Sequence, residues 1–144
     1  MKIAIIFRGV PGSGKSTLAN LMMENFEDSA LHAIDDLHTS SSGFFWDESK
    51  AESLYLVNYA NFIKSCDEGR KLVICDCMNL KFADVELYAD AARKFGYRVY
   101  VISPDLIDEK TASERNKHQV SKVQIAAMIS SWENWPKQTG LDNT

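Results

Sequence analysis

The chain has 144 residues, of which 45% are hydrophobic, and its formal net charge is −4 at pH 7. A chain of this length and apolar content forms one domain with a core of its own, so neither disulfides nor a structural metal are needed to hold it together. The sequence pI of about 5.3 argues against a broad basic face, so we expect any nucleic-acid partner to be held in a local groove.

The first predicted element is a strand over residues 2–7, which is apolar on both faces like a central strand of a parallel sheet. The stretch Gly9-Val10-Pro11-Gly12-Ser13-Gly14-Lys15-Ser16-Thr17 comes next and fits the pattern G-x-x-x-x-G-K-[ST], and a helix is predicted over residues 15–26. In such a strand, loop and helix, backbone N–H groups and the positive end of the helix bind phosphate oxygens. The sequence therefore predicts a nucleoside triphosphate site.

Two side chains of this loop have predicted roles of their own. Lys15 supplies a mobile cation for the β- and γ-phosphates, and Ser16 supplies a hydroxyl for Mg²⁺. ATP and Mg²⁺ are the expected cofactors. The loop residues expected to bind the nucleotide are Gly9, Pro11, Gly12, Ser13, Gly14, Lys15, Ser16 and Thr17.

Two carboxylates follow the second predicted strand, which covers residues 31–34. Asp35 and Asp36 stand at the carboxyl end of that strand, on the sheet edge where open α/β folds bind ligands and where the glycine loop also lies. An acid at this place either accepts a proton from an attacking hydroxyl or holds a metal-bound water. The structural alternative is that the pair only caps the next segment.

Residues 39–47 are predicted to form a loop with three successive aromatic side chains, Phe44, Phe45 and Trp46. These rings either fill the core or line an acceptor pocket by stacking on a base or a sugar, and Trp46 is our candidate for substrate contact. The helix predicted over residues 48–65 repeats apolar side chains at steps of three and four, which indicates packing.

The third predicted strand covers residues 72–75 and is followed at once by Asp76. Four apolar residues and an acid accompany the phosphate loop in many nucleotide-binding folds. Asp76 is therefore expected to hold a Mg²⁺-bound water or to hydrogen-bond Ser16. Asn79, three residues on, either orients a substrate hydroxyl or caps the next helix.

A helix over residues 81–95 and a fourth strand over residues 98–102 complete the predicted sheet. A charged helix is expected over residues 105–117, and a last helix opens at Ser121. Arg115 lies at the joint between these two helices. It either reaches the transferred phosphate, as the lid cation of a phosphoryl-transfer enzyme does, or pairs on the surface with an acid of its own helix.

Taken in order, these motifs resemble the kinase domain of the bacteriophage polynucleotide 5′-hydroxyl kinase family and the small ATP-binding proteins related to it. The likeness runs from Gly9 to about Trp135. It is carried by the phosphate loop, Ile34-Asp35-Asp36, Cys75-Asp76-Cys77-Met78-Asn79-Leu80, and Arg115-Asn116 with Val120-Ser121. The resemblance implies that Asp35 rather than Asp36 is the general base, and that Lys15 and Arg115 neutralise phosphate charge.

Two positions depart from the family pattern on the side that holds the acceptor. Family members tend to carry an Arg three residues after the base, where this chain has His38, a cation only when protonated. The joint after Arg115 is also shorter, which leaves Lys117 and His118 where a second Arg is expected. The candidates for contact with the substrate are Asp36, His38, Trp46 and Asn79.

The expected fold is a three-layer α/β P-loop domain over residues 1–136, with about four parallel strands in the order 2-3-1-4, helices on both faces, and a flexible tail over residues 137–144. Its expected activity is transfer of the γ-phosphate of ATP to a hydroxyl, foremost the 5′-hydroxyl of a polynucleotide or a modified nucleotide. The alternatives are a kinase for a small molecule or nucleoside, and a nucleotide-sensing module that is not a kinase. Three cysteines without metal-ligand spacing, and no signal or membrane-spanning stretch, predict a protein of the reducing cytoplasm.

Overall fold

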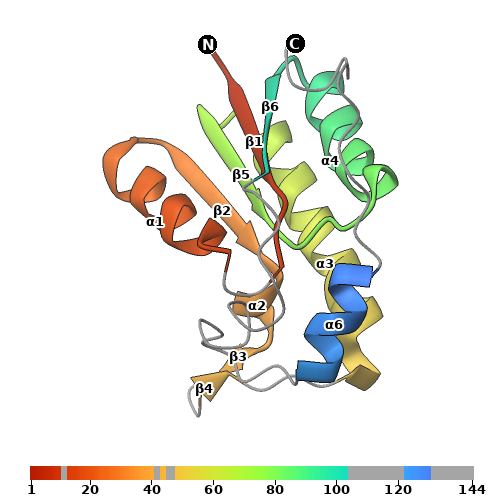
Figure 1. The fold of residues 1–144 in the computed structure, drawn as a ribbon. Helices are drawn as coiled ribbons and strands as arrows, with labels where there is room; N and C mark the ends of the chain where they lie inside the picture. Colours follow the sequence, from red (N-terminus) through yellow and green to blue (C-terminus); the bar gives the residue numbers. More distant parts are fainter. Residues whose placement is uncertain (11–12, 41–42, 45–47, 104–121, 131–144) are drawn as a thin grey trace.

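A computed structural model describes residues 1–10, 13–40, 43–44, 48–103 and 122–130 of the chain. Figure 1 shows how its helices and strands follow one another. In chain order they are β1 (Ile3–Phe7), α1 (Lys15–Asn25), β2 (Ser29–Ala33), α2 (Ile34–Leu37), β3 (Thr39–Ser40), β4 (Gly43–Phe44), α3 (Glu48–Asp67), β5 (Leu72–Asp76), α4 (Phe82–Lys94), β6 (Arg98–Ile102) and α6 (Lys122–Ser130). Within these ranges, no helix has the length and apolar character to cross a membrane.

The main sheet is parallel and has the strand order β2-β5-β1-β6. Numbered along the chain, its strands stand in the predicted order 2-3-1-4, so the α/β P-loop topology is confirmed. Every residue of β5 is buried, because this strand lies between two others. The register pairs both Phe7 of β1 and Ala33 of β2 with Asp76, the last residue of β5. The strands therefore end together at one edge of the sheet.

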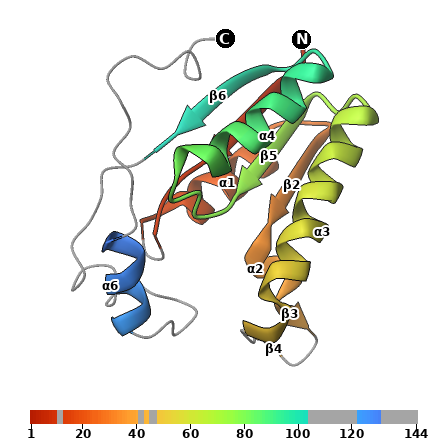
Figure 2. The same ribbon diagram turned by 90° about the vertical axis from the view of Figure 1, so that its right-hand side faces the viewer.

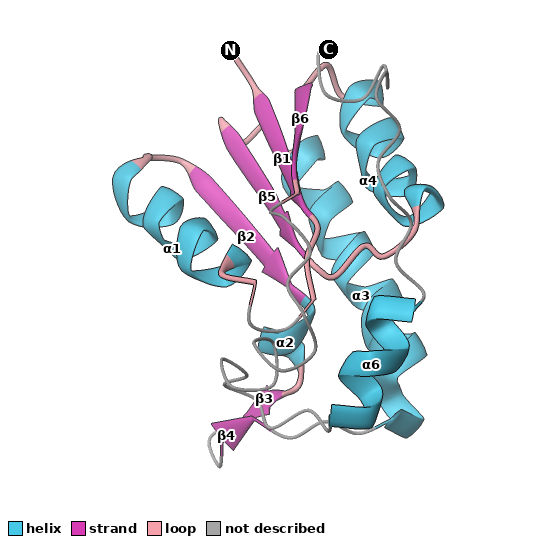
Figure 3. Ribbon diagram, viewed as in Figure 1, coloured by secondary structure: helices cyan, strands magenta, loops and turns pink. Residues whose placement is uncertain are grey.

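Helices cover both faces of the sheet, with α3 and α4 on one face and α1 on the other (Figure 2, Figure 3). Strand residues alternate between these faces: Ile6 packs with the first group of helices, whereas Ile74 packs with the second. In the larger core, Phe62 of α3 is fully buried and meets the ring of Tyr88 edge-to-face at 5.0 Å. The apolar stripe of α3 is therefore a packing surface, as predicted.

The three cysteines are free, buried thiols. Cys66 lies on α3, Cys75 on β5 and Cys77 just beyond β5. Burial raises the pKa of the Cys75 thiol. The amide of Asn58 donates to the hydroxyl of Tyr88 at 3.0 Å and to Cys77 Sγ at 3.3 Å. These polar atoms therefore satisfy one another inside the core.

His32 of β2 packs against α3. The Nε2 atom of His32 lies 2.8 Å from Ser65 Oγ in a hydrogen bond, and its ring meets Phe62 edge-on at 6.0 Å. Burial, followed by the positive charge of Arg70, lowers the pKa of His32 to about 4. The imidazole is therefore neutral in the folded protein at neutral pH.

Two local predictions were wrong. The region from residue 39 was predicted as loop, but Thr39 pairs with Phe44 in a two-stranded antiparallel sheet. Strands of two residues are too short to show the alternation that predicts a strand. The second strand of the main sheet runs over Ser29–Ala33, and Ile34 begins α2 instead of ending the strand.

The last predictions of the chain fall mostly outside the described residues. Helix α6 covers Lys122–Ser130, within the last predicted helix. The predicted charged helix over residues 105–117 and the predicted tail over residues 137–144 lie outside the described ranges.

Candidate active site

The glycine loop joins the end of β1 to the start of α1, as the motif predicts. Gly14 is the N-cap of α1 and has φ of +90°, a left-handed conformation that glycine adopts without strain. A Cβ atom on Gly9 would overlap Ser13 Oγ and would lie 3.2 Å from Ser13 Cβ. The amide of Ser13 donates to the carbonyl of Val10 at 3.1 Å, which turns the loop back on itself. These two glycine positions therefore depend on the absence of a side chain.

Asp76 is the acid that the phosphate loop meets. Ser16 Oγ donates a hydrogen bond to Asp76 Oδ2 at 2.8 Å, which is one of the two contacts predicted for Asp76 from the sequence. Lys15 Nζ lies 3.5 Å from Asp76 Oδ1, in an ion pair whose side chains are only 10% and 4% exposed. Oδ1 accepts no hydrogen bond from the residues that the structure describes. This buried carboxylate therefore holds the serine and the lysine of the loop at one place.

The donor set around Asp76 fits a hard cation. A carboxylate and a serine hydroxyl are oxygen ligands of the kind that Mg²⁺ takes, directly or through its water molecules. Asp76 Oδ1 is a buried acceptor whose partner in the described part of the chain is the Lys15 ammonium at 3.5 Å and which accepts no hydrogen bond there, so it has acceptor capacity left for a cation or its water. Ser16 and Asp76 are therefore chemically suited to hold Mg²⁺.

The second acidic site lies in α2, directly after the neighbouring strand β2. Ala33 is paired with Asp76 across the sheet, so Asp35 stands two residues beyond that register position. Asp35 is partly exposed and Asp36 is exposed, in the first turn of α2. The N-cap of α2 is Ala33, so neither acid is the N-cap residue, and both lie in the first turn of the helix. Both acids lie at the edge that carries Asp76.

His38 closes α2, and its side chain lies inside the fold. Its backbone N–H donates to the carbonyl of Asp35 at 3.1 Å, and the residue is only 6% exposed. His38 stands where members of the resembled family tend to carry an Arg, and the structure buries it at the end of the helix that carries Asp35 and Asp36.

Asn79 has a structural contact that the sequence did not predict. Its amide nitrogen donates to the carbonyl of Phe7 at 2.7 Å, and the residue is 3% exposed with φ of +48°. The N-cap of α4 is Lys81, whose backbone N–H donates to Asp84 Oδ2 at 3.2 Å. Asn79 therefore does not cap α4. Its contact with a substrate hydroxyl stays a prediction.

Sequence reasoning missed Arg8, which lies between β1 and the glycine loop. The residue is fully buried, and its Nε and Nη2 atoms donate to the carbonyls of Asn79 and Leu80 at 2.8 and 2.7 Å. Its guanidinium carbon lies 5.5 Å from the centre of the Phe82 ring. The signal available in the sequence was a charged residue between an apolar strand and a phosphate loop.

Several predicted site residues lie outside the part that the structure describes. They are Pro11, Gly12, Trp46 and Arg115. Thr17, by contrast, is described and is exposed on the first turn of α1.

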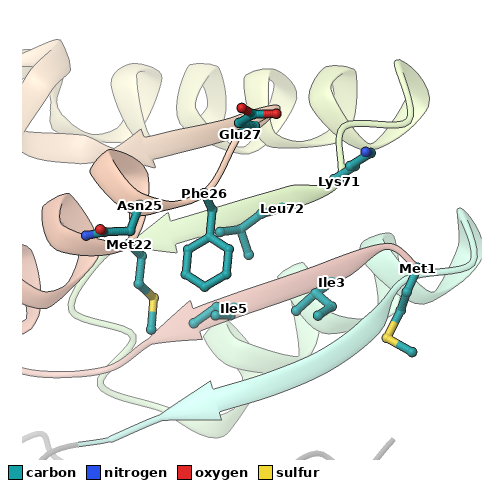
Figure 4. Close-up of a pocket in the computed structure, with 9 residues that line it drawn as sticks. All are labelled: Met1, Ile3, Ile5, Met22, Asn25, Phe26, Glu27, Lys71 and Leu72. Atoms are coloured by element: carbon teal, nitrogen blue, oxygen red, sulfur yellow. The ribbon is translucent and has the colours of Figure 1, made fainter.

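A hollow of about 430 Å³ is separate from this site (Figure 4). It lies where β1 and β5 begin and α1 ends, at the opposite end of the strands from Asp76. Its lining is mostly apolar and comprises Met1, Ile3, Ile5, Met22, Asn25, Phe26, Glu27, Lys71 and Leu72. The strand ends therefore place this hollow away from the phosphate loop.

With this geometry in place, comparison with known proteins assigns the family. Residues 5–135 match a family profile described as an AAA domain, AAA_33. The chain belongs to this AAA domain family. The match includes the phosphate loop, both acidic sites and Arg115, so all the predicted site residues fall within the AAA domain.

Two relatives of this AAA domain are much longer proteins. NEDD4-binding protein 2 from Homo sapiens is 25% identical over 136 residues, which are 92% of this chain and 8% of that protein. The 2′,3′-cyclic-nucleotide 3′-phosphodiesterase of Mus musculus is 28% identical over 123 residues, which are 83% of this chain and 29% of that protein. The AAA domain therefore spans less than a third of each of these relatives.

Solved structures share the fold of this AAA domain. A chain of the Pnkp1/Rnl/Hen1 RNA repair complex matches with a TM-score of 0.70 and 19% identity over 90% of this chain and 43% of that one. Kti12 from Chaetomium thermophilum, in complex with ADP-AlF3, matches with a TM-score of 0.69 and 15% identity over 96% and 85% of the two chains. A gluconokinase from Sinorhizobium meliloti 1021 matches with a TM-score of 0.65 and 16% identity, over 98% and 80%. The fold is that of P-loop kinases and kinase-like nucleotide-binding proteins.

Proposed function

We propose that this AAA domain transfers the γ-phosphate of ATP to a hydroxyl acceptor, foremost the 5′-hydroxyl of a polynucleotide or a modified nucleotide. One observation carries the proposal: two acidic sites lie at the same sheet edge and differ in burial, because Asp76 is buried and Asp35 is partly exposed. Asp76 is engaged by Ser16 and Lys15, whereas Asp35 lies in α2, just after the neighbouring strand β2, and is partly exposed. A phosphotransferase that deprotonates its acceptor hydroxyl can use one acid near the metal and a second acid near the acceptor.

The donor side of the reaction uses the loop and β5. Ser16 and Asp76 would hold Mg²⁺, whose charge offsets that of the nucleotide phosphates. Lys15 has a mobile side chain, so we expect its ammonium group to pass from Asp76 Oδ1 to the β- and γ-phosphates when ATP binds. Backbone N–H groups of the glycine loop complete the phosphate site.

The acceptor side uses β2 and α2. The oxygen of the acceptor hydroxyl forms a bond to the γ-phosphorus, and Asp35 accepts the proton of that hydroxyl. The bond between that phosphorus and the bridging oxygen then breaks, and ADP leaves. Arg115 stabilises the negative charge on the transferred group. Asp36, His38, Trp46 and Asn79 are the proposed contacts of the acceptor.

The nucleic-acid acceptor draws support from two comparisons. One relative acts, by its name, on a 2′,3′-cyclic nucleotide, and one structural neighbour belongs to an RNA repair complex. The net charge of −4 favours a second candidate, a small acceptor whose binding needs no broad basic face. The gluconokinase shows that the fold also serves small hydroxyl acceptors.

The test measures γ-phosphate transfer from labelled ATP with Mg²⁺ to DNA and RNA oligonucleotides with 5′-hydroxyl ends, 3′-nucleotides, nucleosides and small polyols. The wild-type protein is compared with Asp35→Asn and with Glu86→Gln. Glu86 is an exposed acid on α4 and controls for the loss of one negative charge. We expect Asp35→Asn to lower the transfer rate by about 10²–10⁴-fold and Glu86→Gln to leave it unchanged.

The outcomes separate the candidates. Label on an oligonucleotide 5′ end supports the polynucleotide acceptor, and label only on nucleosides, nucleotides or polyols assigns a small acceptor. A protein that binds ATP and Mg²⁺ but labels no acceptor is a nucleotide-sensing module, and the kinase proposal is then wrong. Full activity of Asp35→Asn would remove Asp35 from the role of base.

A further inference from the structure

We infer that Arg8 is a positioning residue, which holds Asp76 at the phosphate loop through Asn79 and thereby sets how strongly Mg²⁺ tightens ATP binding. The inference rests on the donor side of the proposed function. It concerns a residue that lies outside the G-x-x-x-x-G-K-[ST] motif and that is fully buried, so it touches neither the nucleotide nor the acceptor directly.

Four hydrogen bonds tie the end of β1 to the segment that follows Asp76. Arg8 donates to the carbonyls of Asn79 and Leu80 at 2.8 and 2.7 Å. In the opposite direction, the amide nitrogen of Asn79 donates to the carbonyl of Phe7 at 2.7 Å. The fourth bond runs from the Gly9 N–H to the carbonyl of Met78 at 3.0 Å. We call this set the Arg8–Asn79 bridge.

The bridge lies immediately beside both parts of the proposed ATP and Mg²⁺ site, which are the phosphate loop and Asp76. On the β1 side it ends at Gly9, the first residue of the loop that carries Lys15 and Ser16. On the β5 side it holds residues 78–80, which begin two positions after Asp76. The contacts of Asp76 with Ser16 and Lys15, at 2.8 and 3.5 Å, therefore span two segments that the bridge fixes to each other.

Two features of the bridge cost free energy, a buried arginine and a left-handed asparagine. This cost indicates that the bridge depends on these particular residues. A fully buried arginine has lost its hydration. Burying its N–H groups costs free energy unless carbonyl acceptors take the place of the lost water. Asn79 holds φ of +48°, a left-handed conformation that most residues avoid. A guanidinium fork fits two neighbouring carbonyls, whereas a lysine ammonium is a single point of charge. Lysine is therefore expected to replace Arg8 only in part.

Metal affinity is the property that such a residue changes. Groups that orient a metal ligand without touching the metal typically alter metal affinity by about 10–100-fold when they are removed. Without the bridge, Asp76 keeps its charge and its pairing in the sheet, but the start of the loop and the segment after Asp76 are no longer fixed to each other, so the alignment of Asp76 with Ser16 Oγ loosens. Binding of the triphosphate itself depends on the loop N–H groups and on Lys15, so it should change much less.

The experiment measures the dissociation constant of ATP by isothermal titration calorimetry, once with Mg²⁺ and once with EDTA, and compares the ratio of the two values between variants. Arg8→Met removes the forked donors but keeps an apolar stem. We expect the factor by which Mg²⁺ tightens ATP binding to fall by about tenfold or more. The dissociation constant in EDTA should stay within about twofold of the wild-type value, and Arg8→Lys should restore part of the ratio.

Arg70→Met is the matched control, because Arg70 makes similar contacts far from the loop. Its Nε and Nη2 atoms donate to Asp28 Oδ1 and to the carbonyl of Ser29, each at 2.8 Å, where β2 begins. Arg70→Met should lower the free energy of unfolding but leave the ratio of the two ATP dissociation constants unchanged. If Arg8→Met does not fold, Asn79→Gly removes the bond to Phe7 while it tolerates the positive φ, and it should lower the same ratio.

A normal ratio in a folded Arg8→Met or Asn79→Gly protein would show that the bridge serves stability alone, and the inference would be wrong. Equal changes of the ratio in Arg8→Met and Arg70→Met would overturn it as well. Because acceptor phosphorylation is measured separately, such a result leaves the kinase proposal standing. A wild-type protein whose ATP affinity ignores Mg²⁺ would instead overturn the donor side of the proposed function together with this inference.

Discussion

We expect the folded protein to lose stability in mild acid because of one buried imidazole. His32 is hydrogen-bonded to Ser65, and burial together with the charge of Arg70 lowers its pKa from 6.5 to about 4. In the unfolded chain the same side chain binds a proton below pH 6.5. Between pH 6.5 and pH 4 the unfolded state therefore holds more protons than the folded state, and the free energy of unfolding falls as the pH falls.

The size of the effect follows from the two pKa values. At pH 5 the unfolded imidazole is almost fully protonated and the folded one is almost neutral, which lowers the free energy of unfolding by about 2 kcal/mol. His32 is partly exposed, and solvent screening reduces the penalty that a charged imidazole would feel there. We therefore expect a loss of about 1 kcal/mol between pH 7.5 and pH 5, with little further change once the pH is below 4.

The assay is urea unfolding followed by circular dichroism at pH 7.5, 6 and 5, on the wild-type protein and on His32→Gln. Glutamine is neutral at all three values and keeps a polar group near Ser65 Oγ. The carboxylates titrate in both proteins alike, so the difference between the two stability curves isolates His32. The wild-type protein should lose about 1 kcal/mol more than the variant over this range. Parallel curves would refute the reasoning.

Three further predictions concern the core and the donor and acceptor sites. Phe62→Ala should lower the free energy of unfolding by about 3–5 kcal/mol, measured by urea unfolding, because the ring is fully buried against Tyr88; a loss below about 1 kcal/mol would contradict the packing seen around it. Ser16→Ala should weaken ATP binding in the presence of Mg²⁺ far more than in EDTA. Ser16→Thr keeps the hydroxyl and should retain the ATP affinity measured with Mg²⁺, and calorimetry on both variants tests this. If the acceptor is a polynucleotide, its KM should rise steeply between 50 and 200 mM KCl, as it does when phosphates are held by ion pairs, whereas a KM that ignores salt would indicate a neutral acceptor.

The features predicted from the sequence are those that local pattern encodes. The phosphate loop and the acid that ends β5 were found because an apolar run that ends in a glycine loop or in Asp76 marks the carboxyl end of a strand. The parallel register then brings Ser16 to Asp76, as expected. The sheet order followed from the resemblance of the ordered motifs to a known kinase family.

The features missed depend on contacts between distant segments. Arg8 and Asn79 are 71 residues apart, and no pattern near either residue states that one will meet the other. Asn79 therefore looked like a cap or a substrate contact, although its amide holds the end of β1. The end of β2 was misplaced for a related reason: Ile34 is apolar in either state, and its apolar character alone cannot distinguish the last residue of a strand from the first residue of a buried turn of helix.

The strand order also has a consequence for how such domains diversify. Asp76 and the phosphate loop stand on β5 and β1, the two middle strands, each of which is paired on both sides. Asp35 follows β2, which is paired on one side only, and it belongs to a helix of four residues. Substitutions near β2 and α2 disturb fewer neighbours than substitutions in the middle of the sheet. If the proposed function holds, a domain built in this way can exchange one acceptor for another over evolutionary time while its nucleotide site stays intact.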